Sequence, residues 1–172
     1  MTVTVTLTKQ PELYLEADQI TPDVFAGKTL DEIGAIFISE GKVKYPLSEF
    51  ATIEGAAGET AADTKIVLKG DWTKVKRIGQ QMTAGEIVIE SDADMYIGGW
   101  MKGGKLTVNG NVDSFCGIAM AGGELVVNGN AQNHVGSAYR GDWRGMTGGT
   151  LRVKGNVRSE EHTSELQSPG SI

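Results

Sequence analysis

The chain has 172 residues, 24 of them glycine, with a formal net charge of −6 and an aromatic content of only 6%. This acidic balance gives a nucleic-acid role no electrostatic basis. No apolar run in the sequence is long enough to cross a membrane, and the first residues do not have the charged and apolar regions of a secretory signal. A single cysteine excludes an internal disulfide and a thiolate metal cluster, so we expect a cytoplasmic protein.

Residues 1–60 are predicted to form a small α+β cap. Apolar residues alternate with threonine over residues 3–7, which predicts a strand with one buried face. Residues 18–26 are expected to be a loop. A short helix is expected over residues 30–36, with Thr29 as its cap, because a threonine side chain can accept a hydrogen bond from the free N–H groups of a helix start.

The remainder of this cap is expected to contain a hairpin and one helical turn. Residues 37–45 are predicted to form the hairpin, with its bend at Glu40–Gly41. Residues 46–50 are predicted to form the helical turn. Residues 51–55 have the pattern of the later repeats, so they are a candidate for an additional coil ahead of the first.

Residues 61–157 repeat one short phrase about five times, and successive copies start 21, 19, 19 and 26 residues apart. The second and fourth residues of each copy are apolar, as in a strand with one buried face. A unit this short cannot bury its apolar face alone, so the copies must stack. The sequence therefore predicts a mainly β fold, a right-handed parallel β-helix with coils of about 19 residues. The copies begin at Lys65, Glu86, Lys105, Glu124 and Thr150, and their third residues, expected to face outward, are Val67, Val88, Thr107, Val126 and Arg152.

Cysteine and histidine residues in the coils are interpreted as structural. Cys116 occupies an inward apolar position of its unit, so a buried thiol is expected rather than a nucleophile. His134 occupies the turn position that Tyr96 and Phe115 occupy in the preceding units. No second histidine lies at ligand spacing from it, which argues against a metal site.

Asp92 and Asp94 form an acidic pair at a bend. A calcium-binding β-roll would need such aspartates in several turns, and here they occur once. The matching positions carry Asn111, Asn130 and Asn156, which favours a ladder of side-chain to backbone hydrogen bonds. We therefore expect no catalytic, metal-binding or cofactor-binding residue on this chain. An enzyme acting on carbohydrate is the alternative, with this pair as its candidate carboxylates.

The last unit carries seven extra residues, 139–145, which leave the coil. Tyr, Trp and Arg are the residue types that most often anchor protein contacts, so we predict a partner-docking loop. A loop that only covers its own coil and a catalytic loop are the alternatives. A basic stretch at residues 74–85 fits either an acidic partner surface or simple solvation. The predicted docking residues are Tyr139, Arg140, Asp142, Trp143 and Arg144.

Residues 158–172 break the repeat directly after Val157. They have no period and no β-branched run, and they resemble the translation of a sequencing-library adapter. We interpret them as a non-native tail and leave them out of the prediction of fold and function. A natural acidic tail is the alternative.

Seven phrases resemble the C subunit of formylmethanofuran dehydrogenase, and together with the coils they extend the resemblance from about Val5 to Val157. The last of the seven is the most specific, because glycine-rich coils alone occur in other families. The phrases are Lys9–Glu12, Leu15–Asp18, Ile20–Gly27, Asp63–Ile66, Lys76–Gly79, Met82–Ile87 and Tyr139–Met146.

This resemblance implies a structural, non-catalytic subunit of an oxidoreductase complex. Such a complex reduces carbon dioxide and binds it to methanofuran as a formyl group, the first step of methanogenesis. The implied partners are a pterin-binding chain and an amidohydrolase-like chain. Molybdopterin with tungsten or molybdenum, iron–sulfur clusters and zinc are expected on the partner subunits, and the family continues with more coils after Val157. Two other families have similar coils: the C subunit of the formyltransferase/hydrolase complex and the carboxy-terminal domain of glutamate synthase.

Overall fold

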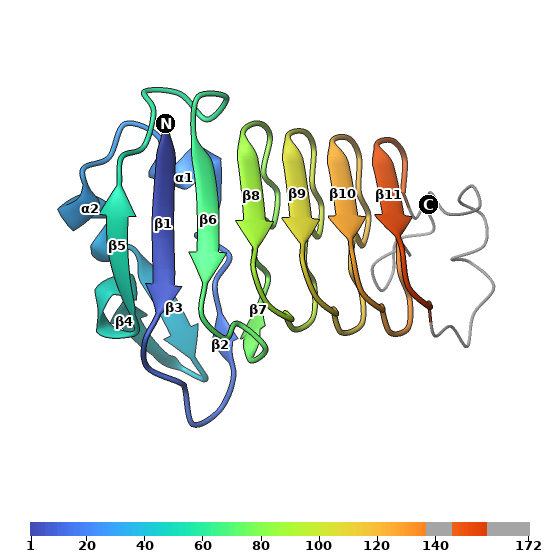
Figure 1. Cartoon of the computed structure of the whole chain (residues 1–172), viewed down its shortest axis with the longest axis horizontal. Coiled ribbons are helices and arrows are strands. Elements are labelled where there is room, and N and C mark those ends of the chain that lie inside the picture. The colour runs from blue at the N-terminus through green and yellow to red at the C-terminus, as the bar shows by residue number, and fades with distance from the viewer. Residues whose placement is uncertain (137–145, 158–172) are drawn as a thin grey trace.

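A computed structural model describes residues 1–136 and 146–157. These residues form two sheets (Figure 1). The larger sheet has seven strands in the order β11-β10-β9-β8-β6-β1-β5, and the smaller has four in the order β4-β3-β2-β7. The larger sheet contains β1 (Thr2–Leu7), β5 (Ala51–Gly55), β6 (Lys65–Lys69), β8 (Glu86–Ile89), β9 (Lys105–Val108), β10 (Glu124–Val127) and β11 (Thr150–Val153). The smaller sheet contains β2 (Leu15–Glu16), β3 (Phe37–Glu40), β4 (Val43–Pro46) and β7 (Val75–Lys76), and the helices are α1 (Pro22–Phe25), α2 (Leu30–Gly34) and a 3-10 turn at Leu47–Glu49.

Strands β6, β8, β9, β10 and β11 are parallel and stacked without offset. Lys65, Glu86, Lys105 and Glu124 begin the first four of these strands and lie opposite one another along the stack. Their charges alternate along the stack. The distance from Nζ to Oε1 is 3.9 Å in the pair Lys65–Glu86 and 4.0 Å in the pair Lys105–Glu124. Each copy of the repeat therefore contributes one strand at the place that the sequence pattern predicts.

A second row of backbone pairs runs along another side of the stack. Isolated parallel bridges join Trp72 to Ala93, Ala93 to Val112, Val112 to Ala131 and Ala131 to Val157. Each unit passes once through the sheet and once through this row before it starts the next strand. The units therefore form a series of stacked coils, seen side by side in Figure 1.

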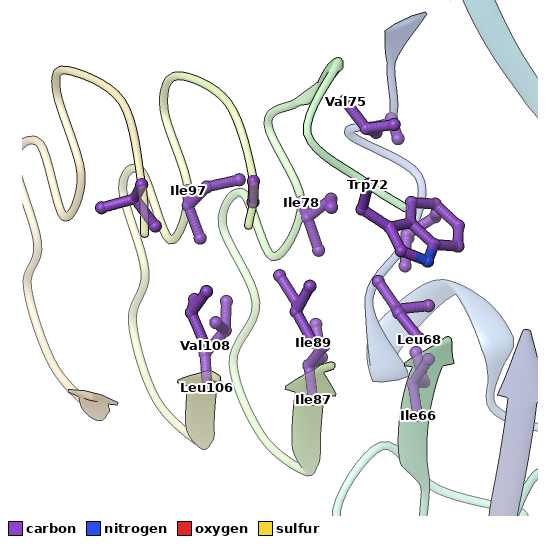
Figure 2. Close-up of a cluster of buried hydrophobic side chains, with 14 of the residues drawn as sticks. Ile66, Leu68, Trp72, Val75, Ile78, Ile87, Ile89, Ile97, Leu106 and Val108 are labelled. Carbon is purple, nitrogen blue, oxygen red and sulfur yellow. The ribbon is translucent and has the colours of Figure 1, made fainter. Parts of the chain in front are cut away.

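Aliphatic side chains fill the inside of the coils. Figure 2 shows Ile89 pointing toward Ile78 and Val108 toward Ile97. All four are fully buried, and burial of one such side chain stabilises the fold by about 1.5–3 kcal/mol. Trp72 covers this core at the first coil, where its Nε1–H donates to the carbonyl oxygen of Lys69 at 2.7 Å.

Glycine at one corner of each coil allows the strands to stack closely. Gly85, Gly104, Gly123 and Gly149 directly precede strands and have φ of 82–83°. A Cβ on Gly104 would lie 2.7 Å from the carbonyl oxygen of Gly85. A side chain is therefore excluded both by the left-handed backbone and by the neighbouring coil.

The strand that extends the stack before β6 is β1. It pairs with β6 in parallel, with Val3 opposite Ile66 and Val5 opposite Leu68. Strand β5 instead pairs antiparallel with β1 at the end of the sheet, so the prediction that residues 51–55 form an additional coil is wrong. The pattern of β5 is similar because it also packs one apolar face on the core, but it runs in the opposite direction.

Most local predictions for the first sixty residues are confirmed. Thr29 and Glu32 form a capping box at the start of α2, although the helix ends at Gly34 rather than at residue 36. Strands β3 and β4 form the predicted hairpin. The loop predicted at residues 18–26 is wrong in part, because α1 lies within it.

Helix α1 has start signals that the prediction missed. The Oγ1 of Thr21 accepts a hydrogen bond from the N–H of Val24 at 3.1 Å, and Pro22 occupies the start of the helix. Both features favour a helix start. The helix is a single turn, too short to show an apolar period.

Val126 is the least exposed of the five third-position residues, at 8%. It lies in register between Thr107 on β9 and Arg152 on β11. Neighbouring strands are about 4.8 Å apart, so a short side chain between these two is shielded even on the outer face.

Candidate functional site

The five residues predicted to dock a partner, Tyr139, Arg140, Asp142, Trp143 and Arg144, lie outside the described residues. Their docking role stays a prediction. Three other groups of residues in the coils have the chemistry of a possible site: a row of rings, a ladder of Asn and Asp side chains, and a buried carboxylate.

The row of rings occupies one corner of successive coils. Arg77, Tyr96, Phe115 and His134 have φ of 69°, 62°, 64° and 60°, so each is in the left-handed region. The N–H groups of the first three each donate to a carbonyl oxygen of the next coil, at 3.0–3.2 Å. These hydrogen bonds hold an otherwise unfavourable backbone, and they place the four side chains above one another.

The side chains of this row stack face to face. The ring centroids of Tyr96 and Phe115 are 5.1 Å apart with planes 9° apart, and those of Phe115 and His134 are 5.0 Å apart with planes 8° apart. The guanidinium of Arg77 lies 4.5 Å from the centroid of Tyr96. The 19-residue spacing predicted that the three rings are equivalent, but it did not reveal that Arg77 belongs to the same row.

The predicted ladder at the acidic bend is confirmed. The Oδ1 of Asp92 accepts a hydrogen bond from the N–H of Asn111 at 2.8 Å. The Oδ1 atoms of Asn111 and Asn130 accept in turn from the N–H groups of Asn130 and Asn156, at 2.7 and 2.8 Å. Asp92 is therefore the first member of a structural ladder that crosses four coils.

Asp94 has a different environment from Asp92. It is 5% exposed, and its Oδ2 has no hydrogen-bond partner. Burial raises its pKa from 3.8 to about 6, and the negative charge of Asp113 contributes to the same shift. A shallow cavity of about 160 Å³ is lined by both carboxylates together with Thr73 and Gln132. The carboxylate that acts on Asp94 is thus Asp113 on the next coil, a relation that the sequence prediction missed.

Cys116 lies in the core, as predicted. It is fully buried, and burial raises the pKa of its thiol to about 12. A thiol in this environment is neither a nucleophile nor a ready metal ligand at neutral pH. Within residues 1–136 and 146–157, no three His, Cys, Asp or Glu side chains are grouped so that they could hold a metal ion.

An open groove of about 880 Å³ lies beside the larger sheet. It is lined by the loop that contains Gly58 and Asp63 and by the strand starts Lys65, Glu86 and Lys105. The lining side chains carry both positive and negative charges, so the groove favours neither an anionic nor a cationic ligand. Among the helices of the described residues, none has the length and apolarity needed to span a bilayer.

Comparison with known proteins identifies close relatives. The chain is 58% identical over 133 residues to the C subunit of the tungsten-containing formylmethanofuran dehydrogenase 2 of Methanococcus maripaludis, which covers 77% of the chain and 48% of the relative. It is 51% identical over 96 residues to the corresponding protein of Methanothermobacter thermautotrophicus, covering 56% of the chain and 36% of that protein. The C subunit of the molybdenum-containing enzyme 1 of Methanosarcina barkeri is 50% identical over 89 residues, 52% of the chain and 30% of the relative.

Over these segments the chain is similar to formylmethanofuran dehydrogenase C subunits. It spans between about a third and a half of the length of these curated relatives. No family model matches the sequence. The resemblance drawn from the seven phrases is therefore confirmed by whole segments of 89–133 residues.

A solved structure also resembles this chain. It is the crystal structure of the formyltransferase/hydrolase complex of Methylorubrum extorquens with methylofuran. The similarity has a TM-score of 0.77 and covers 90% of the chain and 56% of the matched chain, at 26% identity. The dehydrogenase relatives are about twice as identical, so the dehydrogenase family is favoured over the formyltransferase/hydrolase complex.

Proposed function

We propose that this chain is a structural subunit of formylmethanofuran dehydrogenase, the complex that reduces carbon dioxide and binds it to methanofuran as a formyl group. The observation that carries the proposal is the 58% identity over 133 residues to the C subunit of such an enzyme. In this role the complex is an oxidoreductase of methanogenesis that works in the cytoplasm, while this chain contributes no reacting group.

The donor chemistry of the chain supports a structural role. Its single thiol is buried in the core with a pKa of about 12, and Asp92 is occupied by the ladder to Asn111. Asp94 and Asp113 line a shallow cavity with Asp92, and no three His, Cys, Asp or Glu side chains in the described part of the chain are grouped so that they could hold a metal ion. These residues do not fit a pterin, an iron–sulfur cluster or a paired zinc site. We infer that partner subunits, a pterin-binding chain and an amidohydrolase-like chain, hold those groups.

The architecture proposed for this role is a right-handed parallel β-helix covered by the residues before β6. The stacked strands, the second row of bridges and the aliphatic interior support this proposal. A stack of this kind is rigid along its axis, because each coil is hydrogen-bonded to the next across its width. A rigid rod with a varied outer surface is suited to holding several larger subunits in fixed positions.

Reconstitution tests the proposal. The full 172-residue chain would be co-expressed with the pterin-binding and amidohydrolase-like subunits of a Methanococcus dehydrogenase in a strain that lacks the gene for its own C subunit. Native mass spectrometry is expected to show the chain in stoichiometric complex with both, and the isolated chain to carry no tightly bound metal by elemental analysis. A chain that stays monomeric beside these subunits, or that retains stoichiometric metal when isolated, would contradict it.

The structural similarity to the formyltransferase/hydrolase complex is the observation behind a second, less favoured candidate, a structural subunit of that complex. The same experiment separates the two. Parallel co-expression with the Methylorubrum formyltransferase/hydrolase subunits is expected to give no complex, whereas preferential assembly with them would favour the second candidate.

A further inference from the structure

Several aromatic side chains of this chain lie at the surface rather than in the core. The sequence has only three Trp, four Tyr and four Phe. Of the described aromatic side chains, Phe25, Phe50 and Trp72 are buried, whereas Tyr14 and Phe37 are 51% and 39% exposed. Tyr96 and Phe115 are also partly exposed. In a chain with so few aromatics, their position at the surface is not explained by packing of the core.

The exposed ring of Phe37 lies on β3 of the smaller sheet, and the exposed ring of Tyr14 directly precedes β2. Two lysines lie on the outer face of this sheet. Leu15 on β2 is fully buried, so the next residue, Glu16, faces outward. Glu16 lies between two neighbouring strands: Lys76 on β7 is opposite it on one side, and Ser39 on β3 is opposite it on the other. Ser39 in turn lies opposite Lys44 on β4. Lys44 and Lys76 are therefore on the same outer face, with two strands between them.

Each of these two lysines covers an aromatic ring. The Nζ of Lys44 is 4.4 Å from the ring centroid of Phe37, and the Nζ of Lys76 is 5.0 Å from that of Tyr14. Among the described residues, no ion pair within 4 Å involves either ammonium group, and the charge of Lys76 acts on the buried carboxylate of Asp94. Both cations thus lie beside apolar surface and still have free capacity to bind carboxylates.

The outer face of the smaller sheet continues onto the coils through Arg77. Its Nε is 3.1 Å from Oε1 of Glu16, and its guanidinium covers the ring of Tyr96. Tyr96 begins the row of stacked rings described above, with Phe115 next in line. A chain of contacts through Glu16, Arg77 and Tyr96 therefore links the smaller sheet to the second and third of the repeated coils.

We propose that this surface, the docking strip of Tyr14, Phe37, Lys44, Lys76, Arg77 and Tyr96, binds an acidic surface of a partner subunit. The proposal rests on the assembly role proposed above and names the face that carries it. The chain as a whole has a net charge of −6, yet the strip concentrates three cations, and its carboxylate neighbour Glu16 is already paired with Arg77. Aromatic and arginine side chains are enriched where protein interfaces derive most of their binding energy.

The partner contacts the face of the smaller sheet rather than its edge. The edge strand β4 has four residues and carries Lys44 and Pro46, and both features discourage the addition of a further strand. The chemistry expected of the partner is a set of carboxylates interspersed with apolar side chains. Carboxylates would bind the two free ammonium groups, while the apolar groups would cover the rings of Tyr14 and Phe37.

Charge reversal tests the docking strip. The full chain would be immobilised and titrated with the purified pterin-binding and amidohydrolase-like subunits of the dehydrogenase. The double variant Lys44→Glu/Lys76→Glu is expected to raise Kd by at least about tenfold. The matched control is Lys69→Glu/Lys154→Glu, which makes the same charge change at exposed positions, at the end of β6 and directly after β11. It is expected to change Kd by less than about twofold.

A second variant tests the same surface without changing its charge, so that the result does not depend on the folding of the charge-reversed chain alone. Tyr14→Ser/Phe37→Ser removes two exposed rings without changing charge, and it is also expected to weaken binding by at least about tenfold. Equal affinity of the wild type and of both strip variants would overturn the docking strip while leaving the structural role intact. Failure of the wild-type chain to bind these subunits at all would instead overturn the structural role, and with it the strip.

Discussion

The side chain of Asn111 accepts a hydrogen bond from the backbone N–H of Asn130 in the next coil, with an Oδ1 to N distance of 2.7 Å. Asn111→Ala would leave that N–H without its partner, so we expect the free energy of unfolding to fall by about 1 kcal/mol. Urea unfolding followed by circular dichroism measures the change. Asn111→Asp is the control, because Asp92 makes the same bond one coil earlier. If the alanine variant is as stable as the wild type, the ladder contributes nothing to stability.

A methyl group on Gly104 is expected to be strongly destabilising. Gly104→Ala places a Cβ 2.7 Å from the carbonyl oxygen of Gly85 and 2.8 Å from Cε of Met82, in a backbone with φ of 82°. We expect a loss of more than about 3 kcal/mol, enough to lower Tm by more than about 6 °C. Gly41→Ala is the matched control, since Gly41 has φ of 62° but no atom within 4 Å of the added Cβ. It is expected to cost about 1 kcal/mol, and similar losses for the two variants would show that backbone strain alone is responsible.

Stability is expected to depend on pH through Asp94. Its pKa is raised to about 6 in the folded chain, so the folded state holds its proton more tightly than the unfolded state does. Stability should therefore fall as pH rises from about 4 to about 6, and the full penalty should be present at pH 7. Asp94→Asn removes this penalty, and we expect it to raise the free energy of unfolding at pH 7 by about 1–2 kcal/mol, with no gain at about pH 4.

The comparison variant for this pH effect is Asp71→Asn. Hydrogen bonds from Thr73 lower the pKa of Asp71, so its ionised form stabilises the fold and its replacement should have the opposite sign. Denaturation measured across this pH range distinguishes the two. If the free energy of unfolding of the wild type depends on pH as little as that of Asp94→Asn, then ionisation of Asp94 does not destabilise the folded chain.

The thiol of Cys116 is expected to be inert in the native protein. With a pKa of about 12 it is almost entirely protonated at pH 8, and it is also fully buried. A thiol reagent such as DTNB should label it only after unfolding in guanidinium. Cys116→Val should fold normally, because Val135 occupies the matching position of the next coil, whereas Cys116→Ser should lose about 1–3 kcal/mol for a buried hydroxyl. Rapid labelling of the folded chain would contradict this assignment.

The period of the sequence predicted the parallel strands β6, β8, β9, β10 and β11 well, because the same physical demand recurs in every unit. Ile87, Leu106 and Leu125 have to meet the same core, so they show the same pattern, and the position of Cys116 followed from it. The cap has no such redundancy. Strand β5 has the pattern of a coil strand and nothing in its residues reveals its direction, so its antiparallel pairing with β1 was missed.

The environment of Asp94 and the row of rings depend on contacts between coils. Asp94 looked like a partner of Asp92 because the two are close in sequence, but the backbone turns so that Asp92 bonds to Asn111 while Asp94 is buried beside Asp113. Arg77 was assigned to a basic stretch rather than to the ring row. If whole units had been aligned at every position, including positions where the residue types differ, Arg77 would have been placed in line with Tyr96.

The charges at the strand starts alternate, so the charge pattern of the stack repeats every two coils, whereas its backbone repeats every coil. Loss of residues 86–104 would keep every strand in line but would set Lys65 beside Lys105, two like charges directly opposed. Loss of residues 86–123 would instead bring Glu124 beside Lys65 and preserve an attractive pair. Shortening or lengthening this rod should therefore be best tolerated two coils at a time.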